Sequence, residues 1–106
     1  MFCKDDAGQK VDLGGGGSRQ VMSHGGNLMA VEVDFEKDGQ GAAHAHRHEQ
    51  ITYCASGSFR FFLEDKEYIL QAGDTVYCAS NLTHSVICLE AGRLVDVFTP
   101  IREDFL

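Results

Sequence analysis

Hydrophobic and polar residues alternate over short runs along most of the chain, and glycine-containing turn signals separate these runs. The runs are rich in β-branched and aromatic residues, which favour strands. No helical periodicity extends far enough to compete, so the pattern predicts an all-β sandwich or barrel. The expected strands are Leu28 to Phe35, Gln50 to Ala55, Ser58 to Leu63, Glu67 to Leu70, Thr75 to Cys78, Ser85 to Leu89 and Arg93 to Thr99.

Glycines also predict where the chain turns and where the domain begins. Ser56-Gly57 and Ala91-Gly92 are expected to be turns between neighbouring strands. Pro100, the only proline, follows the last run, where it can end a strand without removing an interior ladder bond. The run from Gly14 to Ser18 interrupts the pattern, so residues 1–18 are expected to form a flexible arm. Residues 19–106 then form a single domain.

Composition limits the kinds of binding partner and the cellular compartment that we expect. The chain has 106 residues, which suits one domain, and a net charge of −7, which argues against nucleic acid and anionic membrane surfaces. Its four cysteines form no Cys-x-x-Cys pair, so a disulfide scaffold is not expected. No run is long and apolar enough to span a membrane, and the N-terminus lacks a signal-peptide core. The expected location is cytoplasmic.

Three histidines and one glutamine have the spacing of a divided metal site: His44, His46, Gln50 and His84. In an extended strand, His44 and His46 would point to the same side and could reach one ion. A lone His-x-His pair is as often a polar surface strand, but four matched positions favour metal binding. The donor types suit a divalent transition metal, Zn, Ni, Fe or Mn, and do not select among them.

The pattern His44-x-His46-x-x-x-Gln50, followed by Gly57, Gly73-Asp74 and His84, resembles the paired motifs of the cupin superfamily. The resemblance implies a double-stranded β-helix, or jelly-roll barrel, that places three histidines and one carboxylate or amide around a divalent ion. This sequence departs from the common pattern at several positions. Gln50 replaces glutamate, Ala79 proline, Asn81 glycine and Cys88 asparagine, and Gly39 lies one residue closer to His44 than usual.

The glutamine affects the expected chemistry. An amide oxygen carries no charge, so the ion would keep its full dicationic charge on neutral ligands and act as a stronger Lewis acid. Such a site also supplies no negative charge to balance a high-valent iron centre. Oxygen activation is therefore less favoured than hydrolytic or isomerising chemistry.

The C-terminal segment from Asp96 to Leu106, together with His46 to Ile51, looks like the small cupins called KdgF-like, or pectin degradation, proteins. That resemblance implies conversion of 4,5-unsaturated uronate monosaccharides, from pectin or alginate, into linear keto sugars. It also implies catalytic roles at Asp96, Phe98 and Arg102.

The residue chemistry agrees with a small anionic sugar as substrate. Asp96 and Phe98 alternate on one strand face, so one wall could offer a proton-transfer carboxylate and an apolar surface. Arg102 could hold the substrate carboxylate through two parallel hydrogen bonds. The structural alternatives are that Asp96 pairs or caps, that Phe98 belongs to the core, and that Arg102 binds the terminal acidic residues.

Two other functions remain open from sequence: another small cupin enzyme, such as a dioxygenase or lyase acting on a small acid, and a non-catalytic ligand- or metal-binding cupin. His48 has two interpretations, a residue near the ion or substrate and a solvated loop histidine. Family resemblance also predicts a homodimer, with the N-terminal strands pairing across a two-fold axis.

Overall fold

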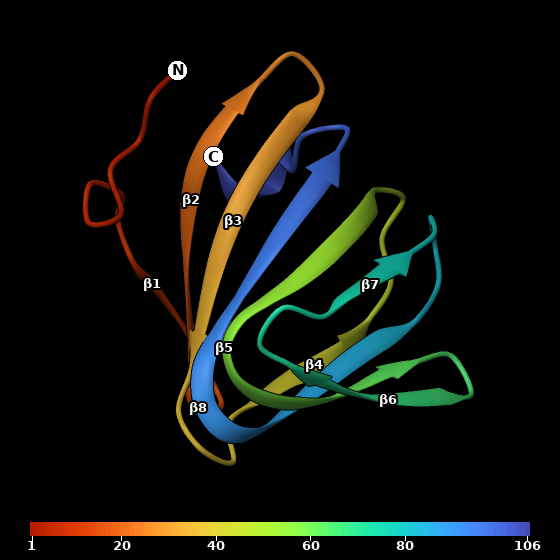
Figure 1. Cartoon of the computed structure of the whole chain (residues 1–106). Coiled ribbons are helices and arrows are strands. Elements are labelled where there is room, and N and C mark those ends of the chain that lie inside the picture. The colour runs from red at the N-terminus through yellow and green to blue at the C-terminus, as the bar shows by residue number, and fades with distance from the viewer.

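The computed structural model describes residues 1–106 and consists almost entirely of strands, which confirms the all-β prediction (Figure 1). A single turn of 3-10 helix, η1, lies near the C-terminus. The elements are β1 (Val11–Gly14), β2 (Gly17–Gly25), β3 (Leu28–Phe35), β4 (Gln40–His44), β5 (Glu49–Leu63), β6 (Lys66–Gln71), β7 (Thr75–Cys78), β8 (His84–Thr99) and η1 (Glu103–Phe105).

Two long strands, β5 and β8, bend sharply, and each contributes to two sheets (Figure 1). The first half of β5 pairs with the second half of β8 in a larger sheet of order β1-β2-β3-β8-β5-β7. The other halves pair in a smaller sheet of order β4-β8-β5-β6. The sheets enclose a core that includes Phe35, Phe59, Phe61, Cys88 and Leu94. This is the expected jelly-roll arrangement.

The two bends lie where the sequence predicted turns. Ser56-Gly57 and Ala91-Gly92 do not end their strands but lie within β5 and β8. A Cβ atom on Gly92 would lie 2.1 Å from the Ser56 carbonyl oxygen, and one on Gly57 would lie 2.5 Å from the Glu90 carbonyl oxygen. The expected turns were therefore wrong: these glycines allow two bent backbones to cross in close contact.

Most other expected strands are confirmed, and β3 and β7 have the predicted bounds. The sequence pattern did not identify β1, β2 or β4, which are short or rich in glycine and polar residues. β8 ends at Thr99, directly before Pro100, as predicted. Along the first half of β5, Gln50, Thr52 and Cys54 are buried inside the barrel while the alternate residues face outward.

The N-terminal segment is more integrated than the sequence indicated. β1 pairs with β2 in an antiparallel hairpin, and Gly14, Gly15 and Gly16 form its turn with positive φ angles. The expected domain boundary at residue 18 therefore lies inside β2. Asp5 reaches further, because its carboxylate accepts a hydrogen bond from Arg93 at 2.8 Å. As the larger sheet's edge strand, β1 has the position that the predicted homodimer requires, and the dimer itself stays a prediction.

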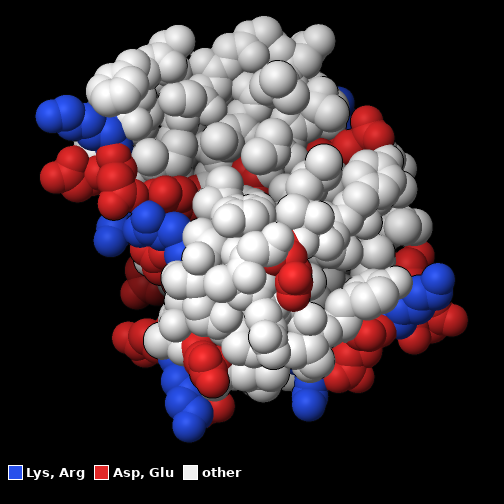
Figure 2. All heavy atoms as spheres, in the orientation of Figure 1, with Lys and Arg blue, Asp and Glu red and all other residues white.

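The outer face of the larger sheet carries several exposed apolar residues. Ile51 lies directly opposite Tyr77 on one side and Val97 on the other, and all three are exposed. In Figure 2 the charged side chains gather mainly toward the margins of the view, and its middle is largely uncharged. No helix in the chain is long and apolar enough to cross a membrane.

Candidate metal centre

Three histidines, from β4, the loop after it and β8, meet at one end of the barrel. His44 is the last residue of β4 and lies opposite His84, the first residue of β8. His46 follows in the loop after β4, so the expectation that one extended strand carries both His44 and His46 was wrong. The three rings are nevertheless close, with centroids 4.3 Å apart for His44–His84, 5.0 Å for His46–His84 and 5.5 Å for His44–His46.

Backbone carbonyls fix which ring nitrogen of each histidine is free. The Nδ1 atoms of His44, His46 and His84 lie 2.8, 2.9 and 3.1 Å from the carbonyl oxygens of Ala42, His48 and Leu82. A carbonyl oxygen only accepts, so each Nδ1 donates its proton and each Nε2 keeps a lone pair. This is the usual arrangement of metal-binding histidines, in which the second nitrogen orients the ring.

The triad fits a divalent cation. One ligand atom from each histidine lies within 4.8 Å of the others, and two nitrogens bound to one ion at about 2.1 Å are at most about 4.2 Å apart, so small rotations suffice. The Nε2 atom of His84 is buried and has no hydrogen-bond partner. Burial also lowers the pKa of His84 to about 4, which keeps this ring neutral and able to bind metal at neutral pH.

Gln50 points its amide oxygen at the triad. Its Oε1 atom lies 3.0 Å from His46 Nε2, so two acceptor atoms face each other and a cation bound by both would remove their repulsion. Its Nε2 atom donates to Thr52 Oγ1 at 2.8 Å and, more weakly, to Asp96 Oδ1 at 3.4 Å. These bonds set the orientation of the amide, and the role of Gln50 as a ligand stays a prediction.

Asp96 lies beside this group on β8, directly opposite Thr52 on β5. Thr52 Oγ1 donates a short hydrogen bond of 2.6 Å to Asp96 Oδ1. Burial raises the pKa of Asp96 to about 6, although the hydrogen bond from Thr52 acts in the opposite direction. A carboxyl group with this pKa can hold or release a proton near neutrality.

Phe98 and Arg102 extend the same wall. The buried Phe98 ring meets the His46 ring edge to face, with centroids 5.7 Å apart, and the Arg102 guanidinium lies 5.1 Å from its centroid. Arg102 donates from Nε and Nη2 to the two carboxylate oxygens of Asp104, at 3.0 and 2.8 Å. The two parallel bonds expected for a substrate carboxylate are thus already made within the chain.

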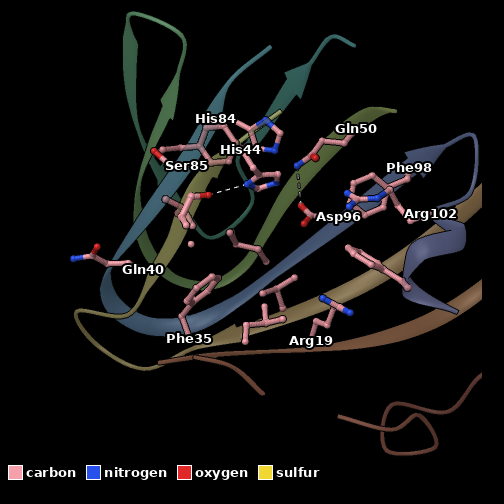
Figure 3. Close-up of a pocket in the computed structure, with 18 residues that line it drawn as sticks. Arg19, Phe35, Gln40, His44, Gln50, His84, Ser85, Asp96, Phe98 and Arg102 are labelled. Atoms are coloured by element: carbon pink, nitrogen blue, oxygen red, sulfur yellow. Dashed lines mark hydrogen bonds between the residues drawn. The ribbon is translucent and has the colours of Figure 1, made fainter. Parts of the chain in front are cut away.

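These residues line a cavity of about 400 Å³, a size typical of small-molecule sites (Figure 3). His44, His84, Gln50 and Asp96 form a polar side, and Val33, Phe35 and Leu94 contribute apolar surface.

Sequence reasoning missed three residues of the site: Arg19, Thr52 and Phe105. Thr52 lies two residues after Gln50 on β5, so both side chains point to the same face of the strand. This alternation could have identified Thr52 from sequence. Arg19 and Phe105 come from segments far apart in the chain, and no sequence signal joins them.

The structure also places His48 and Arg60. His48 is buried, and its ring packs against those of His46 and Phe98, with centroid distances of 5.5 and 6.5 Å. It is therefore not a solvated loop histidine. Arg60, on the second half of β5, is exposed and pairs with Glu67 at 2.7 Å, so it lies on the surface and outside the cavity.

Comparison with known proteins agrees with this geometry. The cupin domain family matches residues 31–98. The chain is 40% identical over 104 residues to the pectin degradation protein KdgF of Dickeya dadantii, covering 96% of this chain and 94% of that protein.

Two solved structures are similar over the whole length of the chain. An RmlC-like cupin from Shewanella frigidimarina superposes with a TM-score of 0.94 at 36% identity, covering 100% of this chain and 96% of that one. KdgF from a Halomonas species superposes with a TM-score of 0.93 at 31% identity, covering 100% and 98%. The chain belongs to the cupin family and is a homologue of the pectin degradation protein KdgF.

Proposed function

We propose that this protein is a metal-dependent enzyme that converts 4,5-unsaturated uronate monosaccharides, released from pectin or alginate, into linear keto sugars. One observation carries the proposal: His44 and His84 of the histidine triad line the same cavity as Asp96, whose pKa lies near neutrality. The similarity to KdgF over nearly the whole chain supports the substrate class.

The ion would be held by His44, His46, His84 and Gln50. A bound divalent ion supplies Lewis acidity toward sugar oxygens. Zn, Ni, Fe and Mn all suit the donor set, so the metal is left open. Because all four donors are uncharged, the site favours this chemistry over oxygen activation.

Asp96 is the proposed acid and base. The reaction is an isomerisation: C4 of the enol ether gains a proton, the ring bond between C1 and its oxygen breaks, and the C1 hydroxyl loses a proton. The products of ring opening are an aldehyde at C1 and a ketone at C5. Asp96 holds the proton that C4 receives, and the hydrogen bond from Thr52 fixes the carboxyl group in place.

Phe98 and Arg102 complete the proposed catalytic group. The Phe98 ring offers an apolar surface for one face of the sugar and excludes water from the reacting atoms. Arg102 is held in place by Asp104 and its guanidinium lines the cavity, where its remaining N–H donors can contact substrate oxygens.

The test is direct. Purified protein is loaded with each candidate metal and incubated with unsaturated galacturonate or mannuronate monosaccharide, and loss of the ultraviolet absorbance of the C4=C5 double bond is followed. We expect acceleration over buffer that a chelator abolishes and added metal restores. No acceleration by fully metallated protein would overturn the proposed function.

Measuring oxygen consumption by the same samples with an oxygen electrode tests the alternative that the protein is a dioxygenase. We expect no oxygen consumption with any of the four metals. Oxygen uptake that depends on the small acid added would replace the proposed function with an oxidative one.

A further inference from the structure

Arg19 lines the cavity from β2, across from the side that carries the histidines (Figure 3). Its side chain is half-buried, and none of the ion pairs in the structure includes it. Three other arginines each hold a carboxylate partner: Arg60, Arg93 and Arg102. Arg19 thus brings a positive charge to the cavity that no side chain compensates.

The ring of Phe105 fixes the position of this charge. The guanidinium carbon of Arg19 lies 4.0 Å from the centroid of the Phe105 ring, and that of Arg102 lies 4.2 Å from the same centroid. Asp104 neutralises only the Arg102 guanidinium. Two cations on one ring with one carboxylate leave a net positive charge at this side of the cavity, which favours a bound anion.

Arg19 and Arg102 differ in how many of their N–H donors are free to bind a ligand. Arg102 already uses Nε and Nη2 on Asp104, whereas the donors of Arg19 have no partner in the protein. A guanidinium with free donors can bind a carboxylate through two parallel hydrogen bonds. Leaving a partly buried charged donor without a partner costs free energy, which a bound carboxylate would recover.

We propose that Arg19 binds the substrate carboxylate and sets the direction in which the sugar enters the cavity. This inference rests on the proposed function and identifies the residue of the same site that binds the anionic group of the substrate. Arg19, Asp96, His44 and His84 line the same cavity, so a sugar whose carboxylate binds Arg19 would share that cavity with the proposed acid and with the histidines. Arg19 is thus a positioning residue that selects acidic sugars over neutral ones.

The experiment compares the unsaturated uronate with its neutral methyl ester in wild-type protein and in Arg19→Gln, Arg19→Lys and Arg60→Gln variants. Arg60 is the matched control, because it is exposed and pairs with Glu67 on the smaller sheet. For Arg19→Gln we expect KM for the acid to rise about 10- to 100-fold with kcat nearly unchanged, as for loss of a charge-assisted interaction. KM for the ester should not change, Arg19→Lys should recover part of the loss, and Arg60→Gln should match wild type.

The outcomes separate this inference from the proposed function. If the metal-loaded wild type converts the uronate and Arg19→Gln keeps both its KM and its preference for acid over ester, Arg19 does not bind the carboxylate. A loss that is equal for acid and ester would also overturn the assignment, because it would indicate a structural role.

A second measurement does not depend on turnover. Calorimetric titration with saturated galacturonate tests anion binding even if no unsaturated sugar reacts. We expect binding by wild type and Arg60→Gln and about 10-fold or weaker binding by Arg19→Gln. Equal affinity in all three proteins would overturn the inference.

Discussion

The amide of Gln50 links the metal centre to Asp96. Its oxygen faces His46, while its nitrogen donates to Thr52, which in turn donates to Asp96. A glutamate at this position would have no donor for Thr52 and would place a second carboxylate beside Asp96. The departure from the common cupin glutamate therefore has a local cause in the hydrogen-bond chain of this site.

Replacing Asp96 with Asn tests the proposed acid. Asparagine keeps the shape and can still accept the hydrogen bond from Thr52, but it cannot transfer a proton. We expect kcat for the unsaturated uronate to fall about 10²- to 10⁴-fold. Metal content, measured by elemental analysis, should stay at the wild-type level, and the exposed Asp65→Asn variant should have wild-type kcat. A kcat within a few-fold of wild type in Asp96→Asn would remove Asp96 from the mechanism.

The Asp104 carboxylate provides a test of pH dependence. Its hydrogen bond from Arg102 lowers the pKa of Asp104 to about 2 from an ordinary value of 3.8. A lowered carboxylate pKa stabilises the fold above pH 3.8, and this contribution disappears as pH falls toward 2. Asp104 is 58% exposed, so we expect Asp104→Asn to lower the free energy of unfolding by less than about 1 kcal/mol at pH 7.

Denaturant titrations at several pH values measure this difference between Asp104→Asn and wild type. The two proteins should become equally stable as pH approaches the pKa of the carboxylate. A difference that stays constant from pH 7 to the acid limit would show that the Arg102 pair does not cause it.

Sequence alone located the histidines but not the complete set of residues around the cavity. His44, His46 and His84 were found because imidazoles at motif spacing are rare and chemically specific. Arg19 was not found because an arginine in a polar strand gives no sign of which side it faces. Sequence left two partners open for the Arg102 guanidinium, a substrate carboxylate and the terminal acidic residues, and only the structure shows that it binds Asp104.

At the scale of elements, the two bent strands account for the main difference between prediction and structure. A glycine between two hydrophobic runs predicts a turn, but the same signal also fits a strand that bends against a close neighbour. Only the pairing of β5 with β8 decides between these alternatives, because Gly57 and Gly92 meet across that pair. Such long-range register is absent from a single sequence.

A Gly92→Ala substitution tests the importance of this crossing. Its Cβ would lie 2.1 Å from a carbonyl oxygen, so the backbone of β5 must move. We expect the free energy of unfolding to fall by at least about 2 kcal/mol, measured by denaturant titration. Gly25→Ala, where nothing lies within 4 Å of the added atom, should change stability by less than about 0.5 kcal/mol. Equal stability of the two variants would show that the crossing can relax without cost.

At the scale of the whole molecule, metal binding and folding should be coupled. The proposed ligands come from β4, the loop after it, β5 and β8, so the unfolded chain has no preformed site. At a free metal concentration of about 100 times Kd, stabilisation is about 2.7 kcal/mol, which raises Tm by roughly 10 °C or more in a domain of this size.

Thermal unfolding with and without chelator measures this coupling. The Tm increase should be present in wild type and much smaller in His84→Ala, which removes the most buried of the three histidines. A full increase in His84→Ala would show that the ion binds elsewhere.

Sharing two strands between two sheets also determines how the molecule opens. Neither sheet can separate without breaking the hydrogen bonds of β5 and β8, so the barrel has no half that can unfold independently. Amide protons in the paired parts of these strands should therefore exchange with solvent only through global unfolding, while those of the exposed edge strand β1 exchange by local fraying. Native-state hydrogen exchange should give one common opening free energy for β5 and β8, and the proposed site, which spans both, should remain assembled until the whole protein unfolds.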